Sequence, residues 1–349
     1  MTPNAFLLHL LFAFVLFLVA LALTRFMIQR VRIMDAPNDR SAHAEPTPKS
    51  GGISIVATFL IGTVVLFLFS NTVAPIRWRF AGFVFSALLV ALIALYDDIK
   101  NKPYVIKVLA QFVATGIVLA CGIIIDEISV PWLGIVEIHG WAYPLTFLWV
   151  IGLSNAFNFM DGLDGLAGGV AVIVSAWFCV ITWSQGSYVV YITSYTILAG
   201  ALGFMAFNAA PARIFMGDVG SVFLGFVFAV LAVIAMRYDG SHTSLFVMPL
   251  LLFNFIYDSA FTFVRRLLWG ERAIDAHRSH LYQLFQRLGY SHRQVSVFHY
   301  SVCMLQGCAA YWMVTWHSPE RTLIYVPFLV FQVVYTVVVI RASRKKGLI

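Results

Sequence analysis

Residues 219–236 read VGSVFLGFVFAVLAVIAM, an apolar run without a charged side chain that is long enough to cross a bilayer as a helix. About eleven runs of this kind follow one another along the chain. They do not alternate between polar and apolar residues, so a transmembrane β-barrel is excluded. Because backbone that faces lipid must form its hydrogen bonds internally, each run predicts a helix. The runs are 5–24, 53–70, 80–96, 104–125, 141–158, 165–183, 188–207, 219–236, 244–264, 295–316 and 322–340.

The composition also indicates a membrane protein. Of the 349 residues, 61% are hydrophobic and 11% are charged, whereas a soluble domain has roughly 25% charged residues. So few ionic groups exclude a disordered chain, a nucleic-acid-binding domain and an ordinary soluble enzyme. We therefore expect an all-α polytopic membrane protein with about 11 transmembrane helices, or about 10, in a single domain over residues 1–349.

The basic residues predict how the chain is oriented. Of the 23 Lys and Arg residues, only Arg77, Arg79, Arg237 and Arg321 fall in one of the two alternating sets of loops. Since cytoplasmic loops accumulate Lys and Arg, we expect the N-terminus outside and the C-terminus in the cytoplasm. The expected cytoplasmic segments are 25–52, 97–103, 159–164, 208–218, 265–294 and the tail 341–349.

Polar motifs gather in these same segments. They are LYDDIKN (95–101), NAFNFMDGLDGLAGG (155–169), FMGDVGS (215–221) and AHRSHLYQ (276–283). Carboxylates at helix ends are ligands that Mg²⁺ prefers, and helix N-termini offer free N–H groups to phosphate. Arg and His side chains can hold a diphosphate. The combination indicates phosphoryl transfer from a nucleotide diphosphate, with Mg²⁺, or alternatively Mn²⁺, as the cofactor.

Each cluster also has a structural interpretation. Asp97 and Asp98 alone fit a solvated helix end, and Asp161 and Asp164 fit helix N-caps. Asp258, inside the ninth run, fits an ion pair with the arginine two turns further on. Two other functions stay open: a secondary transporter with intramembrane carboxylates and a non-catalytic membrane scaffold. The joint placement of the clusters on one membrane face favours catalysis.

In their order and spacing, the four motifs resemble the polyprenyl-phosphate N-acetylhexosamine-1-phosphate transferases of glycosyltransferase family 4, from about Asp35 to Gly289. That family includes enzymes that initiate O-antigen and common-antigen chains, and phospho-N-acetylmuramoyl-pentapeptide translocase. The resemblance implies transfer of N-acetylhexosamine 1-phosphate from a UDP-N-acetylhexosamine to undecaprenyl phosphate, with release of UMP. It further implies Mg²⁺, the bacterial inner membrane with the active site facing the cytoplasm, and a homodimer.

The resemblance also implies roles for individual residues. Catalytic roles are implied for Asp97, Asp98 and Asp161. Metal-binding roles are implied for Asp218, Asn158 and Asp161. The nucleotide is expected at Asp164, Phe215 and Asn208, and the diphosphate at His277, Arg278, His280 and Lys107. First-loop candidates are Arg40, His43 and Lys49.

Two departures from the family motifs narrow the expected donor. The loop AHRSHLYQ lacks the histidine run of the muramoyl-pentapeptide translocases and the His-Ile-His-His of the common-antigen enzymes. The first loop carries PKSGG at 48–52 in place of the translocase motif. These differences argue against a muramoyl-pentapeptide donor and favour an O-antigen-initiating type, in which 6-deoxy-N-acetylhexosamines such as FucNAc or QuiNAc are candidate donors besides GlcNAc and GalNAc.

Overall fold

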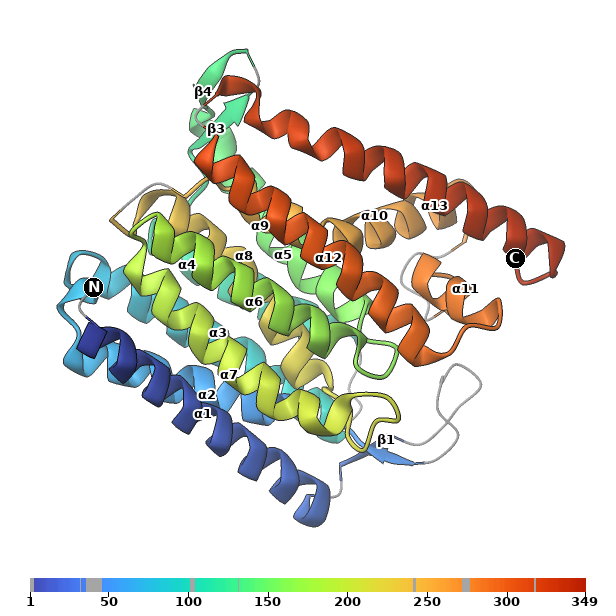
Figure 1. The fold of residues 1–349 in the computed structure, drawn as a ribbon, viewed down its shortest axis with the longest axis horizontal. Helices are drawn as coiled ribbons and strands as arrows, with labels where there is room; N and C mark the ends of the chain where they lie inside the picture. The colour runs from blue at the N-terminus through green and yellow to red at the C-terminus, as the bar shows by residue number, and fades with distance from the viewer. Residues whose placement is uncertain are drawn as a thin grey trace.

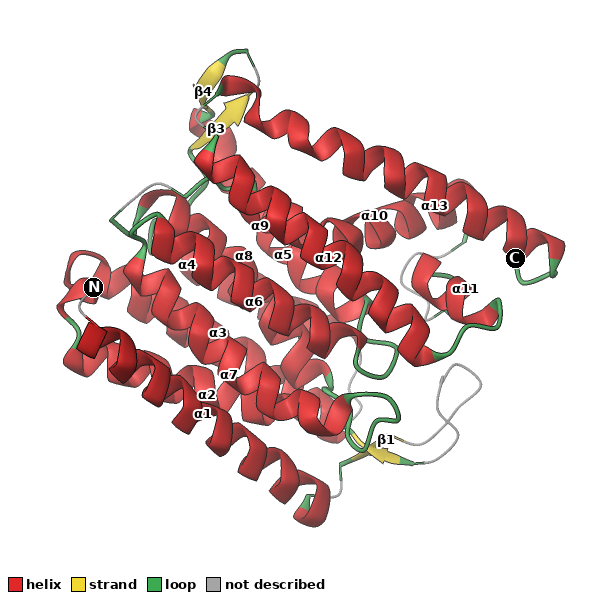
Figure 2. Cartoon of the chain, in the orientation of Figure 1, coloured by secondary structure: helices red, strands yellow, loops and turns green. Residues whose placement is uncertain are grey.

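A bundle of helices makes up most of the chain that the structure, a computed structural model, describes: residues 3–31, 33–35, 46–100, 104–130, 132–240, 243–271, 277–316 and 318–349. Most of the helices lie side by side along a common direction (Figure 1). Strands are confined to short ribbons in the connections (Figure 2). The order of elements therefore matches the prediction of an all-α chain.

Helices occupy every apolar run that the sequence predicts. They are α1 (Pro3–Arg30), α2 (Gly52–Phe69), α3 (Arg77–Lys100), α4 (Tyr104–Ala120), α5 (Ala142–Phe159), α6 (Leu166–Ser184), α7 (Tyr188–Asn208), α8 (Asp218–Arg237), α9 (Val247–Leu251), α10 (Phe253–Leu268), α12 (His292–Thr315) and α13 (Tyr325–Lys345). The connections add α11 (Leu281–Arg287) and the 3₁₀ turns η1 (Asn71–Ile76), η2 (His139–Trp141) and η3 (Pro319–Ile324).

The helices are those of a polytopic membrane protein. Within the described residues, seven helices are long and apolar enough to cross a bilayer. The fold class expected from the sequence is thus confirmed. The total of about 11 spans and the direction in which they cross stay predictions, since some of the remaining helices are shorter, as α4 is with 17 residues.

Helix α8 forms the centre of the bundle. All of its most apolar 18-residue window is buried, against 11% of the corresponding window of α1 and 17% of that of α13. Small residues let neighbouring backbones approach it: a Cβ atom at Gly52 of α2 would overlap the backbone of Gly220, and one at Gly225 would overlap the backbone of Ser154 in α5. The first turns of α8 are thereby packed closely against α2 and α5.

The ninth predicted run is not one continuous helix. It divides at Leu252 into α9 and α10, and Pro249 lies within α9. Pro249 is the third residue of α9, where a helix has no acceptor for an N–H, so the proline suits the start of α9 and does not account for the break three residues later. Beyond the break, α10 buries a polar face, which includes Asn254 and Asp258, and exposes apolar side chains such as Leu268. That distribution suits a helix with lipid on its outer side.

Two antiparallel ribbons mark opposite ends of the bundle. β3 (Glu127–Val130) pairs with β4 (Gly134–Glu137) at one end, and β1 (Met34–Asp35) pairs with β2 (Thr47–Pro48) toward the other end, where α11 also lies (Figure 1). The β1–β2 pair folds the first loop back toward the start of α8. It is at this second end that the polar motifs meet.

Candidate active site

Helix α3 ends against the start of α8, and one carboxylate joins them. Asp98 Oδ2 accepts the backbone N–H of Val219 at 3.0 Å, and its Oδ1 accepts that of Asp218 at 3.3 Å. Free N–H groups at a helix N-terminus favour a negative charge. Asp98 is therefore a cap supplied by another helix, not the solvated helix end of the structural interpretation, and it is only 6% exposed.

The first loop pairs with the segment that leads into α8. The backbone N–H of Phe215 donates to Pro48 O at 2.7 Å, and the N–H of Gly51 donates back to Phe215 O at 3.0 Å. The N–H of Gly52 donates to Met216 O at 2.9 Å. This pairing explains how PKSGG, far away in sequence, reaches the MGDVGS motif.

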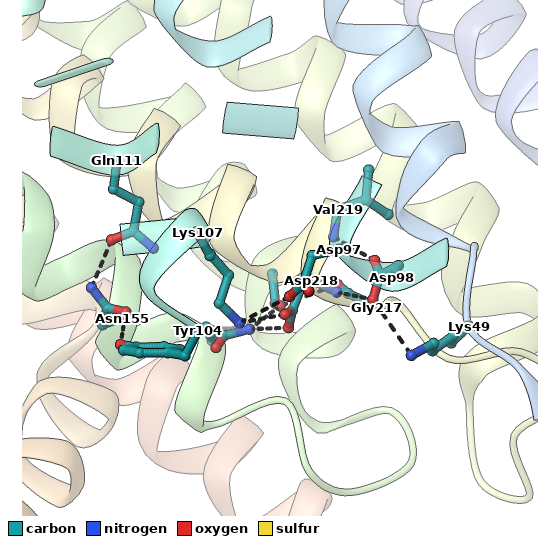
Figure 3. Close-up of polar contacts among 12 residues, drawn as sticks. Lys49, Asp97, Asp98, Tyr104, Lys107, Gln111, Asn155, Gly217, Asp218 and Val219 are labelled. Carbon is teal, nitrogen blue, oxygen red and sulfur yellow. Dashed lines mark hydrogen bonds and ion pairs between the residues drawn. The ribbon is translucent and has the colours of Figure 1, made fainter. Parts of the chain in front are cut away.

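Gly217 allows the two segments to approach so closely. Its φ is +73°, a conformation that L side chains rarely adopt, and a Cβ atom there would overlap the carbonyl oxygen of Lys49. The Lys49 ammonium then lies 4.0 Å from Asp98 Oδ1 (Figure 3). Of the first-loop candidates, Lys49 is thus beside the acids, while Arg40 and His43 lie outside the described residues.

Lys107 points from α4 into the acidic cluster. Its Nζ donates to Asp218 Oδ2 and lies 4.0 Å from Asp97 Oδ2 (Figure 3). The other oxygen of Asp218, Oδ1, accepts from Asn158 Nδ2 at 2.8 Å, and the same amide donates to Ser221 Oγ at 2.8 Å. Residues expected separately for metal and for diphosphate are therefore in direct contact.

A polar row along α4 and α5 extends this cluster. Tyr104 Oη donates to Asn155 Oδ1 at 3.0 Å, and Asn155 Nδ2 donates to Gln111 Oε1 at 2.8 Å. The sequence placed Asn155 in a motif but did not give it a role. The row locks α4 against α5, which fixes the reach of Lys107.

The loop between α5 and α6 brings Asp161 to the same place. Burial, and after it the neighbouring carboxylates of Asp218 and Asp98, raise the pKa of the Asp161 carboxyl to about 7. Carboxylates clustered in this way favour a bound cation, and hard oxygen donors suit Mg²⁺. The described residues contain no preformed group of three His, Cys, Asp or Glu ligands. The donor chemistry still fits Mg²⁺, with the Lys107 ammonium providing positive charge beside Asp218.

Asp164 already has partners within the protein. Its Oδ2 accepts the N–H of Ala212 at 3.1 Å, and its Oδ1 lies 3.3 Å from His292 Nδ1. Ser296 Oγ donates to the Asp164 carbonyl at 3.0 Å. The residue thus joins the α5–α6 loop to α12 and to the α7–α8 loop. Recognition of uracil by Asp164 stays a prediction.

The remaining nucleotide candidates lie at the α7–α8 loop. Asn208 is 4% exposed and its Nδ2 donates to Ile214 O at 2.9 Å, so its side chain closes the loop. Phe215 follows directly and is held through its backbone. Stacking of Phe215 on a nucleobase stays a prediction.

The HRSH loop meets the α5–α6 loop through the residues that follow it. Tyr282 is fully buried and its hydroxyl donates to Phe159 O at 2.9 Å. The rings of His277 and His280 stack with centroids 4.9 Å apart, and the ring of Phe159 lies 5.9 Å from that of His280. Arg278 accepts at its carbonyl from Arg287 at 3.1 Å.

The partner of Asp258 is not the one that the structural interpretation of the sequence expected. Instead of pairing with Arg265, its carboxylate accepts from the HRSH loop, with Oδ1 3.1 Å from His280 Nδ1. Arg265 itself donates to Ser279 O. A lone acid within an apolar run was the available signal, but its partner depends on how α10 and the loop pack together.

Together these contacts define a membrane protein with an acid-rich, lysine-containing site at one end of its helices. The family model described as "Glycosyl transferase family 4" matches residues 80–236. A protein of Bacillus subtilis named "Probable undecaprenyl-phosphate N-acetylglucosaminyl 1-phosphate transferase" is 30% identical over 286 residues, which cover 80% of this chain and 78% of the relative. The chain belongs to glycosyl transferase family 4, as its motifs predict.

Two further relatives agree with that assignment. The "Decaprenyl-phosphate N-acetylglucosaminephosphotransferase" of Mycobacterium tuberculosis is 31% identical over 302 residues, 78% of this chain and 73% of the relative. The "Phospho-N-acetylmuramoyl-pentapeptide-transferase" of Bacillus subtilis is 31% identical over 200 residues, 54% of this chain and 61% of the relative.

Proposed function

We propose that the protein transfers N-acetylhexosamine 1-phosphate from a UDP-N-acetylhexosamine to undecaprenyl phosphate at the cytoplasmic face of the bacterial inner membrane. One observation supports this most directly: Asp98, Asp161 and Asp218, from three separate segments, converge with Lys107 and Lys49 at one end of an apolar bundle. Carboxylates, cations and hydrocarbon-facing helices suit a reaction between two anions of which one is a lipid.

The reaction joins two phosphates. An oxygen of the lipid phosphate attacks the sugar-bearing phosphorus of the UDP-sugar, and the bond between that phosphorus and the oxygen of UMP breaks. Asp97, which lies beside Lys107, would deprotonate or orient the lipid phosphate, and Lys107 and Lys49 would lower the repulsion between the two substrates. The products are a lipid-diphosphate sugar and UMP, so no charge or atom is left over.

Mg²⁺ would be held by Asp218, Asp161 and Asn158, and when bound it neutralises and polarises phosphate oxygens. The residues of the chain do the remaining work. The HRSH loop contributes Arg278 and His280 as donors to the diphosphate. Asp164 and Phe215 would hold the uracil, with Asn208 keeping their loop closed.

The donor we propose is an N-acetylhexosamine for an O-antigen or another surface polysaccharide. In support, the Bacillus and Mycobacterium relatives that cover most of the chain carry N-acetylglucosamine in their names, and AHRSHLYQ lacks the histidine run expected for a muramoyl-pentapeptide donor. Because that loop departs from the family motifs, the candidate donor sugars also include the 6-deoxy-N-acetylhexosamines. A common-antigen or peptidoglycan-type donor is the alternative.

The test uses purified protein in detergent or nanodiscs with a panel of UDP-N-acetylhexosamines. Release of UMP that requires both undecaprenyl phosphate and Mg²⁺, with the lipid product identified by its mass, is the expected result. Transport of a solute into proteoliposomes without release of UMP would contradict the proposal and support a transporter. Lipid product formed from UDP-MurNAc-pentapeptide alone would contradict the donor.

A further inference from the structure

We propose that Asp258 is a positioning residue that fixes the imidazole of His280, so that its Nε2 atom faces the diphosphate. The role given to His280 rests on the function proposed above. The role given to Asp258 rests on hydrogen bonds that can be tested without any reaction.

Asp258 is surrounded by hydrogen-bond donors. The residue is 2% exposed. Its Oδ1 accepts from Leu281 N at 2.9 Å and from Thr262 Oγ1 at 3.0 Å, and it lies 3.1 Å from His280 Nδ1. Its Oδ2 accepts from Tyr282 N at 3.0 Å. One carboxylate therefore accepts hydrogen bonds from the first two N–H groups of α11 and from the imidazole of His280, which precedes them.

This arrangement defines which nitrogen of His280 carries a proton. An ionised carboxylate has only acceptors, so the ring nitrogen beside it must be the donor. The proton is then on Nδ1 whether the imidazole is neutral or charged. Nε2 is the ring atom that remains for the substrate, and it donates to the diphosphate when the imidazole is charged and carries a second proton there. Enzymes use carboxylate partners of this kind to set the tautomer and the direction of a histidine.

Further contacts also hold the imidazole of His280 in position relative to the acidic cluster. Tyr282, whose N–H donates to Asp258, reaches the C-terminal end of α5, where its hydroxyl donates to Phe159 O at 2.9 Å. Gly162 leaves the room for that hydroxyl, because a Cβ atom there would overlap it. Since Gly162 directly follows Asp161 in the chain, a displacement of Asp258 would move His280 relative to the carboxylates.

A purely structural role of Asp258 as the N-cap of α11 makes a different prediction. A cap stabilises the helix without regard to the neighbouring ring, so its removal should act equally with and without His280. A positioning residue acts through His280, so its removal should have little further effect once His280 is gone.

The kinetic test compares Asp258→Asn, His280→Ala and the double variant in the UMP-release assay. We expect Asp258→Asn to lower kcat by about 10- to 100-fold with a smaller change in KM. The double variant should be within about twofold of His280→Ala, as expected for residues that act as a unit. Equal losses from Asp258→Asn in both backgrounds would overturn the proposal.

Asp239 offers a matched control at the other end of the bundle. It is likewise buried, at 6% exposed, and accepts a helix N-terminal N–H, that of Val190, at 2.8 Å. Asp239→Asn should leave kcat within about twofold, because it removes a cap of the same kind without a histidine. A loss of kcat as large as that of Asp258→Asn would show that any buried cap has this effect, and would overturn the proposal.

A spectroscopic measurement on the unaltered protein does not depend on turnover, and it needs a variant only to assign the resonances. In ¹⁵N-histidine-labelled protein, the His280 resonances, assigned by their loss in His280→Ala, should show a protonated Nδ1. An unprotonated Nδ1 would overturn the proposal. A protonated Nδ1 in a protein that releases no UMP from any UDP-sugar would support the Asp258–His280 pair and contradict the proposed function.

Discussion

Replacing Asp218 by Asn tests the centre of the site. The substitution keeps the size of the side chain and an oxygen that can still accept from Asn158, whose Nδ2 lies 2.8 Å away. It removes the charged partner of Lys107 and one of the anionic donors that we propose for Mg²⁺. Each such charged contact contributes about 1.5–3 kcal/mol. Losing both amounts to about 3–6 kcal/mol, so kcat/KM should fall by about 10²- to 10⁴-fold.

The assay is release of UMP from the best UDP-sugar of the panel, with undecaprenyl phosphate in detergent at saturating Mg²⁺. Thermal unfolding of the same preparation shows whether the variant is folded. Asp239→Asn carries the same chemical change far from the site and serves as the reference. A folded Asp218→Asn protein with activity within about threefold of the unaltered protein would refute a metal and lysine partner at this position.

Two further substitutions probe the surroundings of the site, and a third prediction concerns the pH dependence of stability at the other end of the bundle. Gly217→Ala places a Cβ atom against the Lys49 carbonyl at a φ of +73°, and should lower both activity and unfolding temperature, at a cost above about 1 kcal/mol; an unchanged melting curve would contradict the strain. Tyr282→Phe loses the bond to Phe159 O, and should reduce kcat by about three- to tenfold for about 1 kcal/mol; unaltered kinetics would show that this bond does not hold the loop. Burial raises the pKa of Asp239 to about 6 from 3.8, so its contribution to stability is complete below about pH 4 and is lost as the pH rises through about 6, by about 3 kcal/mol. Melting curves of the unaltered protein against Asp239→Asn over that range should diverge, and parallel curves would contradict it.

The sequence predicted the helices well because a membrane imposes a simple local rule. Runs of apolar residues long enough to cross a bilayer became helices, with ends close to the expected positions. The same rule could not reveal the interruption at Leu252, because an apolar run of this length is compatible with either a continuous or a divided helix. The short α11 was also missed, since its N-terminus depends on an acid from a different helix.

For the candidate site, the order of the motifs predicted which segments lie together, but it did not predict which atoms are in contact. Lys107 was expected beside phosphate, and it is found against Asp218 and near Asp97. The partner of Asp258 was missed because hydrogen bonds between segments remote in sequence leave no periodic pattern. Asn208, expected to bind nucleotide, has its side-chain amide directed to Ile214 O, a contact within its own loop that composition does not reveal.

The central position of α8 has a consequence for how the protein is made. A transmembrane helix is first released into lipid and is only later surrounded by its neighbours. Helix α8 is therefore in contact first with lipid chains and then with the side chains of other helices. Its side chains must be apolar enough for the first and small enough, at Gly220 and Gly225, for the second. Substitutions along α8 therefore fall into two classes: those that reduce the amount of protein inserted into the membrane, and those that disturb the packing of the inserted protein. Measuring yield and specific activity together separates the two classes.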